Sequence, residues 1–299
     1  MSDKLYEPII AVPAGNVCGE GPVWSQQEQA LYWVDINAFL WQRYCPQSGS
    51  VHFWQFDEPV CASSLTSTPG VFLLALGSKI IKWNAALDSR EDFSHPEQNL
   101  PGSRLNDGRP SPFGDFWVGS MQNNVDKNGV GSGIDDNSLG TLYRIAQDGT
   151  STVYETNLGI SNTLCWSPNK DIFYFGDTMQ NAIFQWDYDV ATGDISNKRP
   201  FFSGFERGVP DGSAIDSEGY IWNARYGGGC IVRIAPDGTV DRVVDMPVSN
   251  LTCCTFGGAD LRTLYVTSAH QDNELRSGSL FALQVETPGM PENVFQLTS

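Results

Sequence analysis

Hydrophobic and polar residues alternate along this chain in short runs rather than in helical periods. Aromatic and β-branched runs, such as residues 31–34 and 141–145, are separated by Gly, Pro, Asn and Asp. Runs of this composition between turn-forming residues are typical of β-strands. No segment keeps a 3.6-residue hydrophobic period, so the pattern predicts an all-β fold.

The strand pattern also repeats. Similar units begin near residues 21, 63, 106, 161, 210 and 250, at intervals of 42, 43, 55, 49 and 40 residues. A period of about 40–50 residues with about four short strands is that of a β-propeller blade. The sequence therefore predicts one domain over residues 1–299, a six-bladed β-propeller with about four antiparallel strands in each blade.

Two details of the propeller follow from the same pattern. Because uncovered sheet edges invite aggregation, residues 6–12 are expected to complete the blade that contains residues 280–285. The longest interval contains a Gly-rich insert at residues 123–137, which is interpreted as a surface loop.

The net charge of the chain indicates which classes of partner it is not expected to bind. The chain has 18 Lys and Arg against 35 Asp and Glu, a formal net charge of −17. Neutralising phosphates requires clustered Lys and Arg, so unaided binding to nucleic acid or to an anionic membrane is not expected. The apolar runs are far shorter than the ~20 residues of a membrane-spanning helix.

The expected compartment is the cytoplasm. The first residues are too acidic, and their apolar run too short, for a secretory signal. The seven cysteines form no C-x-x-C pair and are interpreted as reduced core thiols. A monomer or a small homo-oligomer is expected.

Several catalytic motifs are absent from the sequence. There is no G-x-S-x-G, no G-x-G-x-x-G within a βαβ unit and no H-E-x-x-H. The three histidines, His52, His95 and His270, are therefore interpreted as surface or structural residues.

Four polar residues occupy the same phase of different repeats: Glu20, Asn106, Asn162 and Asp211. Each immediately precedes or begins the first strand of its unit. Innermost strands run beside the central channel of a propeller, so these side chains are expected to converge at one mouth of the channel. Two carboxylates and two amides form an oxygen-rich site suited to a hard divalent cation. Such a cation would offset the repulsion between the two carboxylates.

A structural alternative exists for two of these segments. Asn106-Asp107-Gly108 and Asp211-Gly212 are also common turn formers. Glu20 lies between Gly19 and Gly21-Pro22 and has no turn role, which favours a functional interpretation of that residue.

Several short segments share the order and blade phase of one known family: residues 19–24, 104–108, 119–121, 159–162, 210–212 and 216–219. Taken together, they resemble the family of senescence marker protein, gluconolactonase and luciferin-regenerating enzyme. The resemblance implies a six-bladed propeller that hydrolyses sugar lactones with a divalent metal in the central channel, the metal being calcium, zinc, iron or manganese in different members.

The resemblance also implies roles for individual residues. Glu20, Asn162 and Asp211 resemble the metal ligands, and Asp211 also resembles the proposed general base. The residues that resemble substrate contacts, or a site residue beside the metal, are Arg104, Asn106 and Asp107.

Three positions depart from the family pattern: Thr163, where a glycine is frequent, Arg225, and His270, where an arginine is frequent. Thr163 bears on the shape of the pocket, and the other two bear on substrate choice. One hypothesis is that Arg225, with Arg104, faces the channel and recognises a negative group on the lactone. The alternative is that Arg225 is a strand residue paired with a surface carboxylate.

The predicted function is metal-dependent hydrolysis of an aldonolactone to its aldonic acid in carbohydrate breakdown. The reaction needs a polarised carbonyl, an activated water and a stabilised oxyanion, which a Lewis-acidic cation and one carboxylate supply without a covalent nucleophile. Two alternatives remain: a propeller hydrolase of aryl esters or phosphotriesters, and a non-catalytic propeller that binds a ligand or partner.

Overall fold

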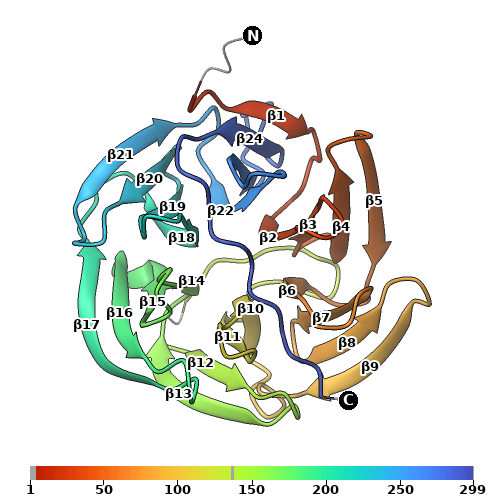
Figure 1. Cartoon of the computed structure of the whole chain (residues 1–299). Coiled ribbons are helices and arrows are strands. Elements are labelled where there is room, and N and C mark those ends of the chain that lie inside the picture. Colours follow the sequence, from red (N-terminus) through yellow and green to blue (C-terminus); the bar gives the residue numbers. More distant parts are fainter. Residues whose placement is uncertain (1–4, 136–137, 299) are drawn as a thin grey trace.

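Six four-stranded antiparallel sheets form a ring around a central channel (Figure 1). The computed structural model describes residues 5–135 and 138–298. In five of the sheets the strands follow one another in sequence order. The predicted all-β, six-bladed propeller is confirmed.

The first three blades contain β2 to β13. Blade 1 consists of β2 (Gly19–Ser25), β3 (Ala30–Asp35), β4 (Leu40–Cys45) and β5 (Ser50–Gln55). Blade 2 consists of β6 (Val60–Leu65), β7 (Val71–Leu76), β8 (Ile80–Asn84) and β9 (Ser89–Ser94). Blade 3 consists of β10 (Ser103–Pro110), β11 (Phe116–Gln122), β12 (Gly140–Ile145) and β13 (Ser151–Leu158).

The other three blades contain β14 to β24 and β1. Blade 4 consists of β14 (Ser161–Trp166), β15 (Ile172–Asp177), the short 3-10 helix η1 (Thr178–Gln180), β16 (Ala182–Tyr188) and β17 (Ile195–Ser203). Blade 5 consists of β18 (Val209–Ile215), β19 (Ile221–Tyr226), β20 (Cys230–Ile234) and β21 (Val240–Asp245). Blade 6 consists of β22 (Leu251–Gly257), β23 (Thr263–Ser268), β24 (Leu280–Gln284) and β1 (Ile9–Val12).

The two ends of the chain close the ring within blade 6. β1 pairs antiparallel with β24, with Ile9 opposite Ala282 and Ile10 opposite Phe281. The predicted closure is therefore confirmed. The N-terminal strand covers the edge that β24 would otherwise expose.

Hydrophobic cores lie between neighbouring blades. One cluster contains Trp41 from blade 1 and Trp83 from blade 2, whose rings meet edge to face with centroids 4.9 Å apart. Equivalent clusters join each of the other neighbouring pairs of blades. The first strand of each blade is almost fully buried, whereas outer strands such as β5 and β13 are largely exposed. The ring thus holds its innermost strands rigidly beside the channel.

Every innermost strand is interrupted by a break in register near its start. In β2 the break lies between Glu20 and Val23, and in β14 it lies between Asn162 and Cys165. The remaining breaks lie between Val60 and Ala62, Leu105 and Gly108, Pro210 and Ser213, and Leu251 and Cys254. A bulge adds an unpaired residue and re-aims its side chain. The predicted site residues therefore turn toward the channel where regular pairing stops.

The segment after β24, dark blue in Figure 1, crosses the face of the ring that is turned toward the viewer there. We call this face the rear face and the opposite face the front face. Bridges pair Asp216 with Gly289 and Thr66 with Phe295, so the segment joins blade 5 to blade 2. Phe295 is fully buried and packs against Phe93. The tail covers the channel at this end.

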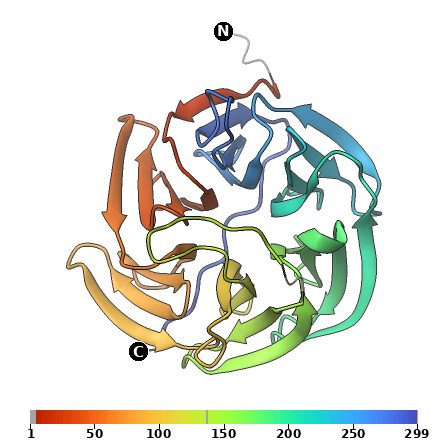
Figure 2. The ribbon, with the colours of Figure 1, turned by 180° about the vertical axis from the view of Figure 1, so that it is seen from behind.

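The insert that follows β11 crosses the front face, which is turned toward the viewer in Figure 2, where the insert is yellow-green. Asn37 of blade 1 donates a hydrogen bond from Nδ2 to the carbonyl oxygen of Gly129 at 2.8 Å. Val125 is buried in the core between blades 1 and 2. Most of residues 123–135 are exposed, so the predicted surface loop is confirmed for the described part of the insert, which Val125 and Gly129 anchor to the ring. Residues 136 and 137 lie outside the described residues.

All seven thiols are free, and those of Cys61, Cys165, Cys230, Cys253 and Cys254 are buried, as predicted for core cysteines. In the part of the chain that the structure describes, no helix is long and apolar enough to cross a membrane.

Candidate functional site

A cavity of about 230 Å³ opens at the front end of the channel, between the starts of the inner strands and the insert. Five of the seven predicted site residues line it: Glu20, Arg104, Asn106, Asn162 and Asp211. They come from blades 1, 3, 4 and 5. The prediction that these inner-strand positions converge at one mouth of the channel is therefore confirmed.

The two carboxyl groups in this cavity lie against each other. Glu20 and Asp211 are both 8% exposed, and a hydrogen bond joins their side chains. Burial, followed by the negative charge of Asp107, raises the pKa of Glu20 to about 8. Burial and the charge of Glu20 raise the pKa of Asp211 well above its ordinary value. Without a cation, the pair therefore holds a proton at neutral pH.

Hydrogen bonds fix the amides beside the carboxyl pair. Asn106 donates from Nδ2 to the oxygen Oδ1 of Asn162 at 3.2 Å and to the carbonyl oxygen of Ser161 at 2.9 Å. Asn162 donates from Nδ2 to Oγ1 of Thr178 at 2.8 Å, and Thr178 in turn donates to the carbonyl oxygen of Pro210 at 2.7 Å. These bonds orient both amides and link blades 3, 4 and 5.

This donor set fits a divalent cation. Two buried carboxyl groups that oppose each other's ionisation are relieved when a cation replaces their shared proton, and the Asn162 amide oxygen adds a hard ligand. Among residues 5–135 and 138–298, no group of three or more His, Cys, Asp or Glu is arranged to hold a metal ion. Glu20, Asp211 and Asn162 would therefore form an open coordination site completed by oxygens from outside the protein.

Thr163 supports the site from a strained backbone position. Its φ is +55°, a left-handed conformation that β-branched residues rarely adopt. Its Oγ1 donates to the carbonyl oxygen of Asp211 at 2.5 Å and lies 3.0 Å from Oγ of Ser213. Thr163 is fully buried, so this departure from the family pattern acts through the backbone of Asp211 rather than through contact with the cavity.

Asp107 does not line the cavity, and its predicted role as a substrate contact is therefore not supported. The residue is 4% exposed, and its Oδ2 has no hydrogen-bond partner among the described residues. Burial raises the pKa of Asp107, and the nearby guanidinium of Arg109 acts in the opposite direction. Asp107 is instead a buried charge deeper in the channel.

Arg225 does not face the channel either, and both interpretations of it from the sequence are wrong. Its guanidinium is fully buried and its Nη2 donates to Oδ1 of Asn181 and to the carbonyl oxygen of Gly208, each at 2.7 Å. It forms no ion pair with a carboxylate among the described residues. Burial lowers its pKa to about 10. Because side chains alternate along a strand, the next residue, Tyr226, lines the cavity in its place.

His270 lies outside the cavity. Its side chain is 60% exposed and its Nε2 lies 3.4 Å from Oδ1 of Asp272. This position agrees with the interpretation of the histidine as a surface residue.

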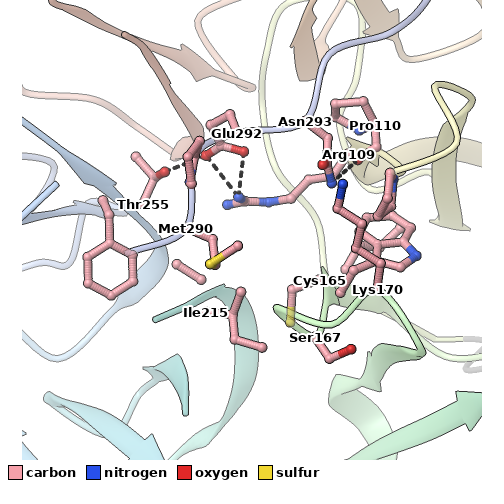
Figure 3. A pocket seen from close by; sticks show the side chains of 16 residues that line it. Arg109, Pro110, Cys165, Ser167, Lys170, Ile215, Thr255, Met290, Glu292 and Asn293 are labelled. Atoms are coloured by element: carbon pink, nitrogen blue, oxygen red, sulfur yellow. Dashed lines mark hydrogen bonds and ion pairs between the residues drawn. The ribbon is translucent and has the colours of Figure 1, made fainter. Parts of the chain in front are cut away.

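The rear end of the channel is closed by an ion pair (Figure 3). Nη1 of Arg109 lies 3.1 and 3.3 Å from the two carboxylate oxygens of Glu292, which belongs to the C-terminal tail. Thr255 donates from Oγ1 to Glu292 at 2.5 Å, and Arg109 also donates from Nη2 to the carbonyl oxygen of Cys254 at 3.0 Å. The tail is therefore bound to the channel wall by charge as well as by backbone pairing.

Sequence reasoning missed the apolar part of the cavity and three polar residues of its lining, Asn124, Thr178 and Thr252. Ile36, Met121, Ile160 and Tyr226 supply apolar surface, and the insert contributes Asn124 and Ile134. Met121 lies inside a segment that resembles the family, so the sequence could have indicated it as a site residue. Nothing in the sequence indicated the residues of the insert, because their place in the cavity depends on how the insert packs across the ring.

Comparisons with known proteins agree with this architecture. Residues 18–270 match the family model described as the SMP-30/gluconolactonase/LRE-like region. The chain is 35% identical to the 6-deoxy-6-sulfogluconolactonase of Pseudomonas putida over 94% of this chain and 95% of that protein. It is 34% identical to the pentonolactonase XacC of Haloferax volcanii over 92% and 93%.

A solved structure is also similar. The calcium-binding protein regucalcin of Agrobacterium tumefaciens aligns with a TM-score of 0.88 and 27% identity, over 96% of this chain and 97% of that chain. Fold and site thus define a six-bladed propeller whose carboxylates and amides converge in the central channel. The chain belongs to the SMP-30/gluconolactonase/LRE-like family.

Proposed function

We propose that this protein is a metal-dependent lactonase that opens an aldonolactone to its aldonic acid in sugar breakdown. The observation that carries the proposal is the buried, mutually hydrogen-bonded pair of Glu20 and Asp211 in a cavity open to solvent. Relatives of similar length whose names describe lactonases of six-carbon and five-carbon sugar acids support it.

Four residues of the cavity have a part in this mechanism. Glu20, Asn162 and Asp211 would hold the cation, which supplies Lewis acidity toward the lactone carbonyl when bound. Asp211, once ionised, accepts a proton from the attacking water at its carboxylate, as a general base. Asn106, which already donates to the oxygen of Asn162, keeps that amide oriented.

Substrate binding combines polar and apolar contacts. Arg104 offers a guanidinium at the wall of the cavity, and Ile36, Ile160 and Tyr226 offer apolar surface to the carbon face of a sugar ring. The relative from Pseudomonas putida is named for a lactone with a sulfo group. A substrate that carries an acidic substituent is therefore part of the proposal, with Arg104 as its partner.

The compartment and the domain organisation are also proposed. We infer that the chain forms one domain and acts in the cytoplasm. Seven free thiols, five of them buried, favour a reducing compartment.

The experiment is a panel of purified lactones assayed by acid release with added Ca²⁺, Zn²⁺ or Mn²⁺ and after chelation. The proposal expects hydrolysis of an aldonolactone that a chelator abolishes and one metal restores. Hydrolysis unaffected by chelation would refute the metal mechanism. Turnover of aryl esters or phosphotriesters in preference to lactones would favour the related propeller hydrolases, and no turnover would favour a binding protein.

A further inference from the structure

We propose that Asn124, a residue of the insert, determines which lactones this enzyme prefers. It holds the Arg104 guanidinium with an uncharged oxygen and thereby leaves the charge of that guanidinium available for a carboxylate or sulfonate on the substrate. This inference rests on the proposed function, because it concerns the same cavity.

The contact between the two side chains is bidentate. Both Nε and Nη2 of Arg104 donate to Oδ1 of Asn124, at 3.1 and 3.0 Å. The Nδ2 of Asn124 donates to the carbonyl oxygen of Ser132 at 3.5 Å, which directs the amide oxygen toward the guanidinium. A carboxylate commonly occupies this position opposite an arginine, and here an amide does so.

The other partners of Arg104 are also uncharged. Its Nη1 donates to the carbonyl oxygen of Leu105 at 2.9 Å and to Oδ1 of Asn106 at 2.8 Å. A sulfur contact to Cys61 is long, at 3.9 Å. Within residues 5–135 and 138–298, Arg104 forms no ion pair, and the second N–H of its Nη2 has no acceptor.

The charged residues that line the cavity show the consequence of pairing Arg104 with the uncharged Asn124. Glu20 and Asp211 are the acidic residues of the lining, and Arg104 is its basic residue. When a divalent cation balances the two carboxylates, the charge of Arg104 remains uncompensated. Arg104 is only 5% exposed to solvent, so its guanidinium attracts an anion more strongly than the same group in water, because the screening is weaker. The cavity therefore favours lactones with a negative substituent.

The variant Asn124→Asp tests this reasoning with almost no change of shape. It places a carboxylate on Nε and Nη2 of Arg104 and neutralises the guanidinium. We expect kcat/KM for a carboxylate-bearing lactone, glucaro-1,4-lactone, to fall by roughly 10- to 100-fold, the range of one charge-assisted hydrogen bond. The value for neutral glucono-1,5-lactone, measured in parallel, is the reference, and the ratio of the two values should fall.

Asn123→Asp is the matched control. Asn123 is the preceding residue of the insert, it is exposed, and its Oδ1 accepts a hydrogen bond from the backbone of Val125 rather than from Arg104. The control adds the same negative charge one residue away. An equal fall in selectivity in both variants would assign the effect to general charge and overturn the proposal, as would an unchanged ratio in Asn124→Asp.

A binding measurement separates this inference from the proposed function. The open-chain dianion glucarate is titrated calorimetrically into wild type and both variants, in the presence of the activating metal or, if none activates, of Ca²⁺. Glucarate binding that is weakened only in Asn124→Asp supports the role of Asn124 even if no lactone is hydrolysed. If the lactones are hydrolysed but glucarate binds with equal affinity to all three proteins, the lactonase function is supported and the role of Asn124 is refuted.

Discussion

Replacing Glu20 with glutamine should stabilise the metal-free protein while removing its metal site. Burial and the negative charge of Asp107 raise the pKa of Glu20 from an ordinary 4.5 to about 8 in the folded chain. Between these values the folded protein keeps a proton that the unfolded chain releases. Wild-type stability therefore falls as the pH rises from about 4.5 to 8, and the loss is complete above 8. Glutamine has the same shape and no charge to bury.

The size of this change in stability follows from the same shift in the pKa of Glu20. One pKa unit corresponds to about 1.4 kcal/mol, so Glu20 lowers the free energy of unfolding by roughly 3 kcal/mol at pH 7. Unfolding entropy is about 2.1 cal/mol/K per residue, or about 0.6 kcal/mol/K for 299 residues. Glu20→Gln should thus raise the melting temperature of the metal-free protein by about 5 °C at pH 7 and by little at pH 5.

The assay is thermal unfolding in a chelating buffer from pH 5 to 8.5, repeated with added divalent metal. Metal should raise the melting temperature of wild type and leave Glu20→Gln nearly unchanged. Glu206→Gln, which removes an exposed carboxylate, serves as the control. Parallel melting curves across the pH range, or a less stable Glu20→Gln at pH 8, would refute the reasoning.

Other substitutions test the remaining parts of the structure. Asp211→Asn should lower metal-saturated lactone turnover by about 10²- to 10⁴-fold, because it removes the general base, and turnover near the wild-type rate would contradict that role. Glu292→Ala leaves the guanidinium of Arg109 buried without its carboxylate, where the two side chains are 12% and 11% exposed. Urea unfolding should show a loss of about 3 kcal/mol, and a loss below about 1 kcal/mol would mean that the tail is held by backbone pairing alone. Arg225→Met should destabilise the protein and leave lactone selectivity unchanged, since the side chain bonds to loops outside the cavity and to Asn223 of its own strand. Altered selectivity would mean that Arg225 reaches the substrate.

The sequence was sufficient to predict the ring but not the details of its inner surface. Six repeats with strand-like patterning predict six blades, because each blade forms from local segments and packs on its neighbours in order. Glu20, Asn162 and Asp211 were found because they share one phase of the repeat. The bulges that turn them inward carry no separate sequence signal, since they arise from pairing between strands.

The errors have a common physical origin. Arg225 was expected in the channel, but the side of a strand that a residue faces depends on register, and the neighbouring Tyr226 takes that position. The Gly-rich insert is a surface loop as predicted, but its composition gave no sign of the contacts that anchor it. Its contact with Asn37, more than 90 positions earlier in the chain, decides where it lies. Long-range contacts of this kind also hid Asn124.

The tail that crosses the rear face covers that end of the channel, while the cavity opens at the front end. Between the cavity and the tail, the channel is filled by buried Asp107, Arg109 and Cys253. Substrate and product must therefore pass each other at the same entrance, under the insert. An acid formed in the cavity carries a new carboxylate past Arg104 on its way out, so its departure competes directly with the arrival of the next lactone. Accumulated product should accordingly act as a competitive inhibitor, and its release becomes a step on which the rate of the whole cycle depends.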